Sequence, residues 1–408
     1  MMSQSWKKQF IILWSGQSVS ILTSAIIQMS LVWYLTSKTE SAAIMSIGTL
    51  MGFIPRAIIG PFAGVIIDRF SRKKIMLIAD LFIAIISLIP VFYGFFAELP
   101  IWIIMLVLFC RSLGSAFHTP ALQAATPLIV PKESLTQYAG FAQGFDSLSH
   151  LISPAIASIL FNLLDLNVLM LIDVFGALFA VLTLSFVIIP NTPGIERHKR
   201  AGYMSEFQEG LAIVKTEPAV VFIIVVSCIY SIIYSPIGTY YPLITITHFG
   251  GSIGDSALAE TVLSLGSLCG AFGLGLVGKK INKMRSFFLS IFTYGACLIV
   301  IGAVPKSLFI VFVIASAILG ASIPFYSSIR TSIIQAKFEP QYLGRIFAMT
   351  SAMTTFTTPI GLICAGIFAE KVGIGNWFFF SGIASVVLAA ISLIKLRGVS
   401  KKEQPNEN

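Results

Sequence analysis

Long apolar stretches alternate with short polar connections along almost the whole chain. A helix of about 20 apolar residues is long enough to cross a bilayer, and the pattern predicts twelve such helices. The predicted spans are residues 9–35, 42–67, 75–97, 101–125, 135–161, 167–189, 219–246, 256–278, 287–304, 307–330, 344–369 and 375–396. Little of the chain remains outside the lipid, so any functional chemistry is expected between the helices.

Composition supports an all-α integral membrane protein. Hydrophobic residues make up 56% of the 408 positions and charged residues only 11%, with a mean hydropathy of +0.90. A soluble domain carries about 25% charged residues. The five cysteines lie inside predicted spans without metal-like spacing, so we expect no metal site and no cofactor. No Ser/His/Asp set or pair of catalytic carboxylates stands out, and we do not expect an enzyme.

Positive charge is distributed unevenly between the predicted loops. If the N-terminus and every second loop face the cytoplasm, those segments hold most of the 27 Lys and Arg residues. The opposite loops hold Lys38, Lys306 and Lys371. Cytoplasmic loops of membrane proteins carry such an excess of positive charge. The distribution therefore predicts that both termini are cytoplasmic, and it explains the net charge of +9 without a nucleic-acid partner.

A polar segment in the middle of the chain divides the spans into two groups of six. The expected organisation is an N-terminal six-helix half over residues 1–189, a cytoplasmic linker over 190–217, a C-terminal six-helix half over 218–396 and a cytoplasmic tail over 397–408. A weak repeat relates the halves, because a Gln-Tyr-x-Gly run follows Pro120 and Pro324 at the same spacing. Repeated halves are typical of transporters that bind substrate between them and work by alternating access.

The most specific motif lies at the end of the second span. Its candidate gating residues are Gly64, Asp68, Arg69, Arg72 and Lys73. The run resembles the G-x-x-x-D-R-x-G-R-K/R loop of the major facilitator superfamily, with Ser71 in place of the usual glycine. The resemblance implies that Asp68 meets the start of the eleventh span near Gly344. Such a contact would latch the two halves together and release when they rock.

The spacing of glycines in the second half resembles that of nucleotide-binding motifs. Gly273, Gly275 and Gly278 match a dinucleotide fingerprint, and Lys279 follows them as in a phosphate-binding loop. Both motifs need a strand before them and a helix after them, whereas these glycines end a predicted membrane span. We therefore expect no nucleotide partner. The energy for transport is expected from an ion gradient, with a partner ATPase as the alternative.

Ionisable residues inside the spans are candidates for function, because they cost several kcal/mol in lipid unless they are paired or hydrated. Arg111 and Asp146 lie near the middle of adjacent predicted helices, where they can pair. A paired carboxylate can take up a proton when the pair opens, since burial favours its neutral form. Arg111, Asp146 and Asp80 are the proton-coupling candidates. A permanent structural ion pair is the alternative.

Asp80 and two further carboxylates have different expected surroundings. Asp80, in the third span, is expected to pair with Arg69 or Arg72 in a gating network. Asp173 and Glu260 lie early in their spans near the outer side, and we expect them at the membrane interface, with proton coupling as the alternative.

Polar and aromatic residues predict a substrate cavity. Gln17, Ser24 and Gln28 recur on one face of the first span. The other cavity candidates are Arg56, His118, His150, Tyr230, Tyr234, Phe325 and Tyr326. Aromatic side chains with polar tips suit a bulky amphipathic substrate that needs few fixed hydrogen bonds, although each would equally suit a position facing lipid. Arg330 ends the tenth span and is expected to reach the inner surface.

Several runs resemble one branch of the superfamily. Trp14-Ser-Gly-Gln17, Phe117-His-Thr-Pro120 and Pro324-Phe-Tyr-Ser327 are similar to those of the macrolide efflux (Mef-type) proteins, which are drug:proton antiporters. The resemblance covers nearly the full chain and implies proton-driven export of macrolides across a bacterial cytoplasmic membrane. The glycine-proline motif of exporters is missing from the fifth span. An exporter of an endogenous metabolite, such as a siderophore or a lipid, and a non-transporting receptor or assembly subunit stay open.

Overall fold

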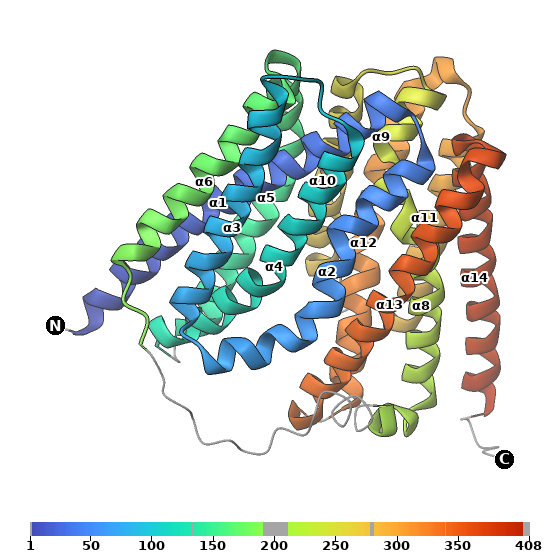
Figure 1. The fold of residues 1–408 in the computed structure, drawn as a ribbon. Helices are drawn as coiled ribbons and strands as arrows, with labels where there is room; N and C mark the ends of the chain where they lie inside the picture. The colour runs from blue at the N-terminus through green and yellow to red at the C-terminus, as the bar shows by residue number, and fades with distance from the viewer. Residues whose placement is uncertain (1, 132–133, 191–210, 278–280, 339, 403–408) are drawn as a thin grey trace. The chain divides into compact units, whose positions relative to one another are not determined.

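Twelve long helices make up almost all of the described chain (Figure 1). The computed structural model describes residues 2–131, 134–190, 211–277, 281–338 and 340–402, and inside some helices it describes the backbone without every side chain. The long helices are α1 (Met2–Thr39), α2 (Ala42–Arg69), α3 (Arg72–Gly94), α4 (Ile101–Ile129), α5 (Leu135–Leu163), α6 (Leu166–Phe186), α8 (Pro218–Thr239), α10 (Ile253–Val277), α11 (Lys283–Ala303), α12 (Phe309–Lys337), α13 (Pro340–Val372) and α14 (Ile374–Lys402).

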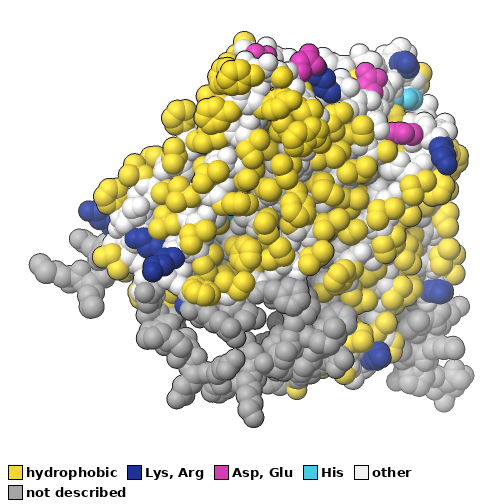
Figure 2. Space-filling view, viewed as in Figure 1, with side chains coloured by type: hydrophobic (Ala, Val, Ile, Leu, Met, Phe, Trp, Pro, Cys, Tyr) yellow, Lys and Arg dark blue, Asp and Glu magenta, His cyan; other side chains and the backbone are white. Residues whose placement is uncertain are grey.

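The helices are long and apolar enough to cross a membrane. Eleven of them contain such a stretch among the described residues, and α5 contributes a shorter apolar run over Leu151–Leu163. In lipid every backbone polar group must be satisfied inside the protein, which favours helices. Large apolar side chains cover much of the visible surface (Figure 2). Exposed apolar side chains of the described chain include Ile85, Phe92 and Phe175. These findings confirm the predicted all-α integral membrane fold.

The chain divides into two compact units. The first comprises residues 1–40 and 47–200, and the second comprises residues 41–46 and 201–408. In the first unit, α6 packs against both α1 and α3, α3 also packs against α4, and α1 packs against α5. In the second unit, α10 packs against α12, α11 against both α12 and α14, and α8 against α13. Each unit therefore has its own set of packed helices.

Small residues allow the helices of the second unit to approach closely. A Cβ atom on Gly266 of α10 would lie 2.1 Å from the carbonyl oxygen of Ala317 on α12. The same contact recurs one turn later, where a Cβ on Gly270 would lie 2.3 Å from the carbonyl oxygen of Ala321. Membrane helices associate mainly through such tight van der Waals packing, because lipid supplies no hydrophobic driving force between them.

The seventh predicted span is interrupted near its end. Helix α8 ends at Thr239, and a short helix α9 (Tyr241–Leu243) and a π-helical turn η2 (Ile244–His248) follow it. Pro236 and Pro242 lie on either side of the break. A proline inside a helix removes an N–H donor and clashes with the preceding turn, so these residues account for the interruption.

Candidate functional site

A buried ion pair links α4 and α6 in the first unit. Nη1 of Arg111 donates to Oδ2 of Asp173, and the two side chains are only 7% and 1% exposed. Ser87 of α3 donates to the same carboxylate oxygen at 2.7 Å, and Ser24 of α1 donates to Oδ1 at 3.0 Å. Four helices therefore contribute to one carboxylate, which accepts hydrogen bonds from two hydroxyl groups and a guanidinium.

The same network surrounds the guanidinium of Arg111. Nη1 also donates to Oγ of Ser87 at 3.1 Å, and Nη2 donates to the backbone carbonyl of Ser24 at 3.4 Å. Nε is buried and has no hydrogen-bond partner within the described part of the chain. A buried charge is tolerated only where a counter-charge and hydrogen bonds replace its hydration. Each of the two buried charges therefore depends on the other as its counter-charge in this position.

The partner of Arg111 differs from the expected one. Asp146 was the partner expected from the sequence, whereas the structure pairs Arg111 with Asp173. The side chains of Asp146 and His150 lie outside the described residues, and their roles stay predictions. Asp173 was expected near the outer membrane interface, and the structure shows that its side chain is almost fully buried among the helices. The position of this carboxylate inside a strongly apolar helix was the sequence signal for a buried, paired role.

A second polar contact lies between α3 and α4. Oδ1 of Asp80 is 3.2 Å from Nε2 of His118, and the side chains are 4% and 12% exposed. The two groups are close enough for charge interaction, although their geometry is not that of a hydrogen bond, and Oδ2 of Asp80 has no hydrogen-bond partner among the described residues. Arg69 or Arg72 was the expected partner; the structure places His118 beside Asp80, and the side chain of Arg69 lies outside the described residues.

The predicted gating loop is described in part. The side chains of Gly64, Asp68 and Arg69 lie outside the described residues, so the latch stays a prediction. Arg72 is half-buried. Lys73 donates to the backbone carbonyls of Ser185 and Val187, both at 2.8 Å. These carbonyls lie at the C-terminal end of α6, where a cation satisfies unpaired acceptors and the negative end of the helix dipole.

Tyrosines line a pocket of about 230 Å³ in the second unit, between α8, α12 and α13. The ring of Tyr230 lies 5.8 Å from that of Tyr234 and 4.8 Å from that of Tyr326, measured between centroids. Nη1 of Arg330 donates to the hydroxyl of Tyr326 at 3.3 Å, and its guanidinium carbon lies 5.3 Å from the same ring centroid. The pocket therefore combines aromatic faces with one cation.

Three predicted cavity residues, Tyr230, Tyr234 and Tyr326, meet in this pocket. Phe325 is not part of its lining. Arg330 was expected at the inner surface of the membrane, and it lines the pocket instead.

The polar row of α1 does not act as one surface. Gln17 is fully buried, and neither polar atom of its amide has a hydrogen-bond partner among the described residues. Ser24 belongs to the network around Asp173, whereas Gln28 is exposed. Arg56 of α2 is exposed as well. Helical spacing predicted a shared cavity face for the three residues of α1; the structure places Ser24 at the ion pair, and the cavity role of the exposed Gln28 and Arg56 stays a prediction.

Comparisons with known proteins agree with this architecture. The family model of the Major Facilitator Superfamily matches residues 13–305 and 238–408. A protein named macrolide efflux protein A from Streptococcus pyogenes is 41% identical over 387 residues, which cover 95% of this chain and 96% of that protein. A protein of the same name from Enterococcus faecalis is 41% identical over 322 residues, covering 79% of this chain and 99% of that protein.

A solved structure has the same fold. A point mutant of the nucleoside transporter NupG superposes with a TM-score of 0.77 at 13% identity, covering 96% of this chain and 99% of that one. The resemblance to the superfamily and to the macrolide efflux proteins is thus confirmed over nearly the whole length. The chain belongs to the Major Facilitator Superfamily of membrane transporters.

Proposed function

We propose that this protein exports amphipathic drugs by proton-coupled alternating access, with macrolide antibiotics as the expected substrate. The similarity to two proteins named macrolide efflux protein A supports the substrate class. The proposed location is a bacterial cytoplasmic membrane with both termini in the cytoplasm, and the uneven distribution of Lys and Arg between the loops supports it.

The buried pair of Arg111 and Asp173 is the observation that supports the proposed proton coupling. In the ionised state Asp173 holds Arg111, Ser24 and Ser87 together across four helices. A proton that binds the carboxylate removes its negative charge and ends the ion pair. The first unit then loses the contact that ties α4 to α6, which lets these helices move. Loss of the proton on the other side of the membrane restores the pair and completes the cycle.

The tyrosine pocket is the proposed contact site for substrate in the second unit. Pockets that enclose drug-sized ligands have volumes of about 300–1,000 Å³, and this pocket is smaller, at about 230 Å³. It would therefore hold one substituent of a bulky substrate against the rings of Tyr230, Tyr234 and Tyr326. Such aromatic surfaces bind apolar groups with few directional constraints, as a drug exporter requires.

Arg330 favours a second candidate function. Its guanidinium lies in the pocket lining and donates to the hydroxyl of Tyr326. A guanidinium binds carboxylates through strong charge-assisted hydrogen bonds. An exporter of an acidic endogenous metabolite, such as a siderophore, would use this cation directly. Competition experiments with acidic compounds against a labelled macrolide separate the two candidates.

Accumulation of labelled erythromycin in a pump-deficient bacterial host tests the proposed function. Cells with and without the protein are compared, before and after addition of a protonophore. We expect lower accumulation in cells that contain the protein, and the protonophore should reverse the difference. Equal accumulation, with the protein shown to be present in the membrane, would remove macrolides as the substrate. A difference that survives the protonophore would remove proton coupling.

A further inference from the structure

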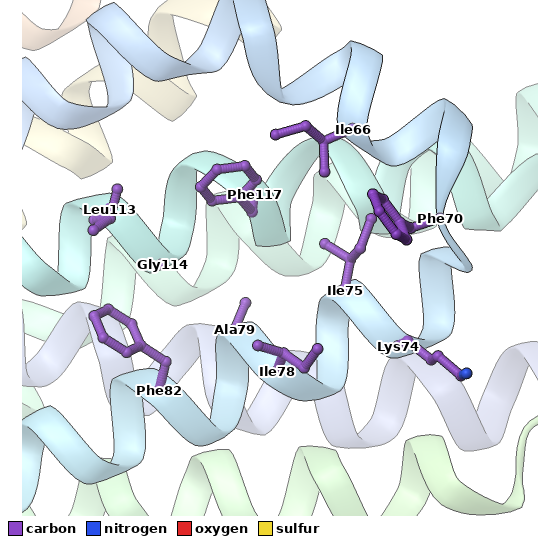
Figure 3. A pocket seen from close by; sticks show the side chains of 10 residues that line it. All are labelled: Ile66, Phe70, Lys74, Ile75, Ile78, Ala79, Phe82, Leu113, Gly114 and Phe117. Atoms are coloured by element: carbon purple, nitrogen blue, oxygen red, sulfur yellow. The ribbon is translucent and has the colours of Figure 1, made fainter.

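An apolar groove of about 480 Å³ lies on the first unit between α2, α3 and α4 (Figure 3). Its lining includes Ile66 of α2, Phe70 directly after α2, Ile78 of α3 and Phe117 of α4. Lys74 supplies the charged group of the lining, at one end of the groove, and its ammonium nitrogen points away from the apolar side chains. The groove is therefore apolar along its length and cationic at one end.

The groove opens toward the surroundings of the helices. Ile66, Phe70 and Ile78 are 39%, 62% and 66% exposed. Ile78 belongs to α3, whose stretch Arg72–Gly94 is long and apolar enough to cross a membrane, so lipid is the medium expected around its exposed side chain. Ordered water needs two to four polar partners, and an apolar lining does not offer them. An acyl chain is thus the natural occupant by chemistry.

The length of the groove matches one leaflet. Lys74 and Phe82 mark its extent along α3, and eight residues of helix rise about 12 Å. The hydrocarbon core of a bilayer is about 30 Å thick, which leaves about 15 Å for the chains of one leaflet. An acyl chain that follows the groove from Lys74 would therefore keep its headgroup at the membrane surface.

The ammonium group of Lys74 at the end of the groove favours a lipid with an anionic headgroup. The neighbouring Lys73 is already engaged with two backbone carbonyls of the α6 terminus, whereas Lys74 is exposed at the end of the groove. We propose that the groove binds one acyl chain of an anionic phospholipid whose phosphate pairs with Lys74. The inference rests on the membrane fold and on this groove, and it does not depend on which substrate the protein exports.

Photo-crosslinking in liposomes tests the proposal on the full-length protein. The probes are phosphatidylglycerol and phosphatidylcholine that each carry a diazirine on one acyl chain, and mass spectrometry maps the labelled residues. We expect phosphatidylglycerol to label Ile78 and Leu113 several-fold more than Ile85. Ile85 is the matched control because it is 62% exposed and lies two helical turns from Ile78 on the same face of α3, outside the groove.

Variants that fill the groove provide the second readout. Ile78→Trp should remove the label from Leu113, whereas Ile85→Trp should leave it. Ile66→Trp fills the groove from α2 and replaces Ile78→Trp if that variant does not fold. Lys74→Gln should lower the preference for phosphatidylglycerol over phosphatidylcholine about fivefold, the factor that one cation near an anionic surface provides, and Lys74→Arg should keep the preference.

Three results would overturn the inference. Equal labelling of Ile78 and Ile85 would mean that the groove has no more affinity for a chain than the rest of the surface. Equal labelling of the groove by the two lipids would remove the role of Lys74 and of the anionic headgroup. Protection of the groove by erythromycin, without protection by unlabelled phosphatidylglycerol, would assign it to the exported drug instead.

Discussion

Removal of either charge of the buried ion pair should destabilise the protein strongly. Asp173→Leu leaves the guanidinium of Arg111 in a position that is 7% exposed, without a counter-charge. Arg111→Met leaves the carboxylate with two hydroxyl donors, from Ser24 and Ser87, and no cation. Breaking a buried pair by removing one partner costs about 3–5 kcal/mol, because the other charge stays buried. We expect each single substitution to lower the free energy of unfolding by about this amount.

The double substitution should cost far less than the sum of the singles. Arg111→Met with Asp173→Leu removes both charges, and apolar replacement of a buried pair is often neutral. In the double variant, the hydroxyl groups of Ser24 and Ser87 lose their shared acceptor. An unsatisfied buried polar group costs about 1–3 kcal/mol, and hydrogen bonds from these hydroxyls to carbonyls of their own helices can partly offset that cost. The coupling energy should therefore be a few kcal/mol, well above the ~0.5 kcal/mol of independent sites.

Reversible unfolding in mixed micelles, followed by tryptophan fluorescence, measures this double-mutant cycle. The surface pair of Lys38 and Glu98 is the matched control, since it joins atoms 3.5 Å apart while its side chains are 46% and 90% exposed. Exposed pairs couple by less than about 1 kcal/mol, so Lys38→Met and Glu98→Leu should be nearly additive. Additive losses at Arg111 and Asp173 as well would refute the view that these two charges depend on each other.

Three other substitutions give separate tests. Gly266→Leu should destabilise the second unit by about 1–3 kcal/mol or more in a thermal unfolding assay, because its Cβ would lie 2.1 Å from the carbonyl oxygen of Ala317. Gly273→Leu is the control and should be tolerated in the same assay, because a Cβ at Gly273 would have no atom within 4 Å. Arg330→Gln should leave labelled macrolide binding largely intact and abolish competition by acidic compounds; loss of macrolide binding in a folded variant would show that the cation serves the drug. Asp68→Asn should slow transport while drug binding stays measurable, and abolished binding in a folded protein would contradict the predicted latch.

The membrane fold was predictable because lipid leaves few alternatives. A backbone in hydrocarbon must satisfy its own polar groups, so each apolar stretch of sufficient length predicted a helix. The break after Thr239 was not part of the prediction, although Pro236 and Pro242 marked its place. Proline is tolerated in membrane helices where neighbouring groups satisfy the freed backbone, so its presence alone does not tell whether a helix ends.

The partners of buried residues were harder to predict than the residues themselves. Arg111 stood out because a charge inside a span is costly. Its partner depends on which helices are neighbours, and α6 packs against both α1 and α3, which loop lengths do not reveal. Ser24 joins the network while Gln28, one turn later on the same predicted face, is exposed. Spacing along a helix gives a shared face, and tertiary packing decides what that face meets.

Transport by the purified protein in proteoliposomes tests the central claim most directly. A pH gradient is imposed across the membrane, and uptake of labelled erythromycin is compared between the wild type, Arg111→Ala and Asp173→Asn, with folding checked by size-exclusion chromatography. We expect the gradient to drive uptake in the wild type and neither folded variant to respond to it. Wild-type response to the gradient in Asp173→Asn would contradict the claim that this buried pair couples proton movement to export.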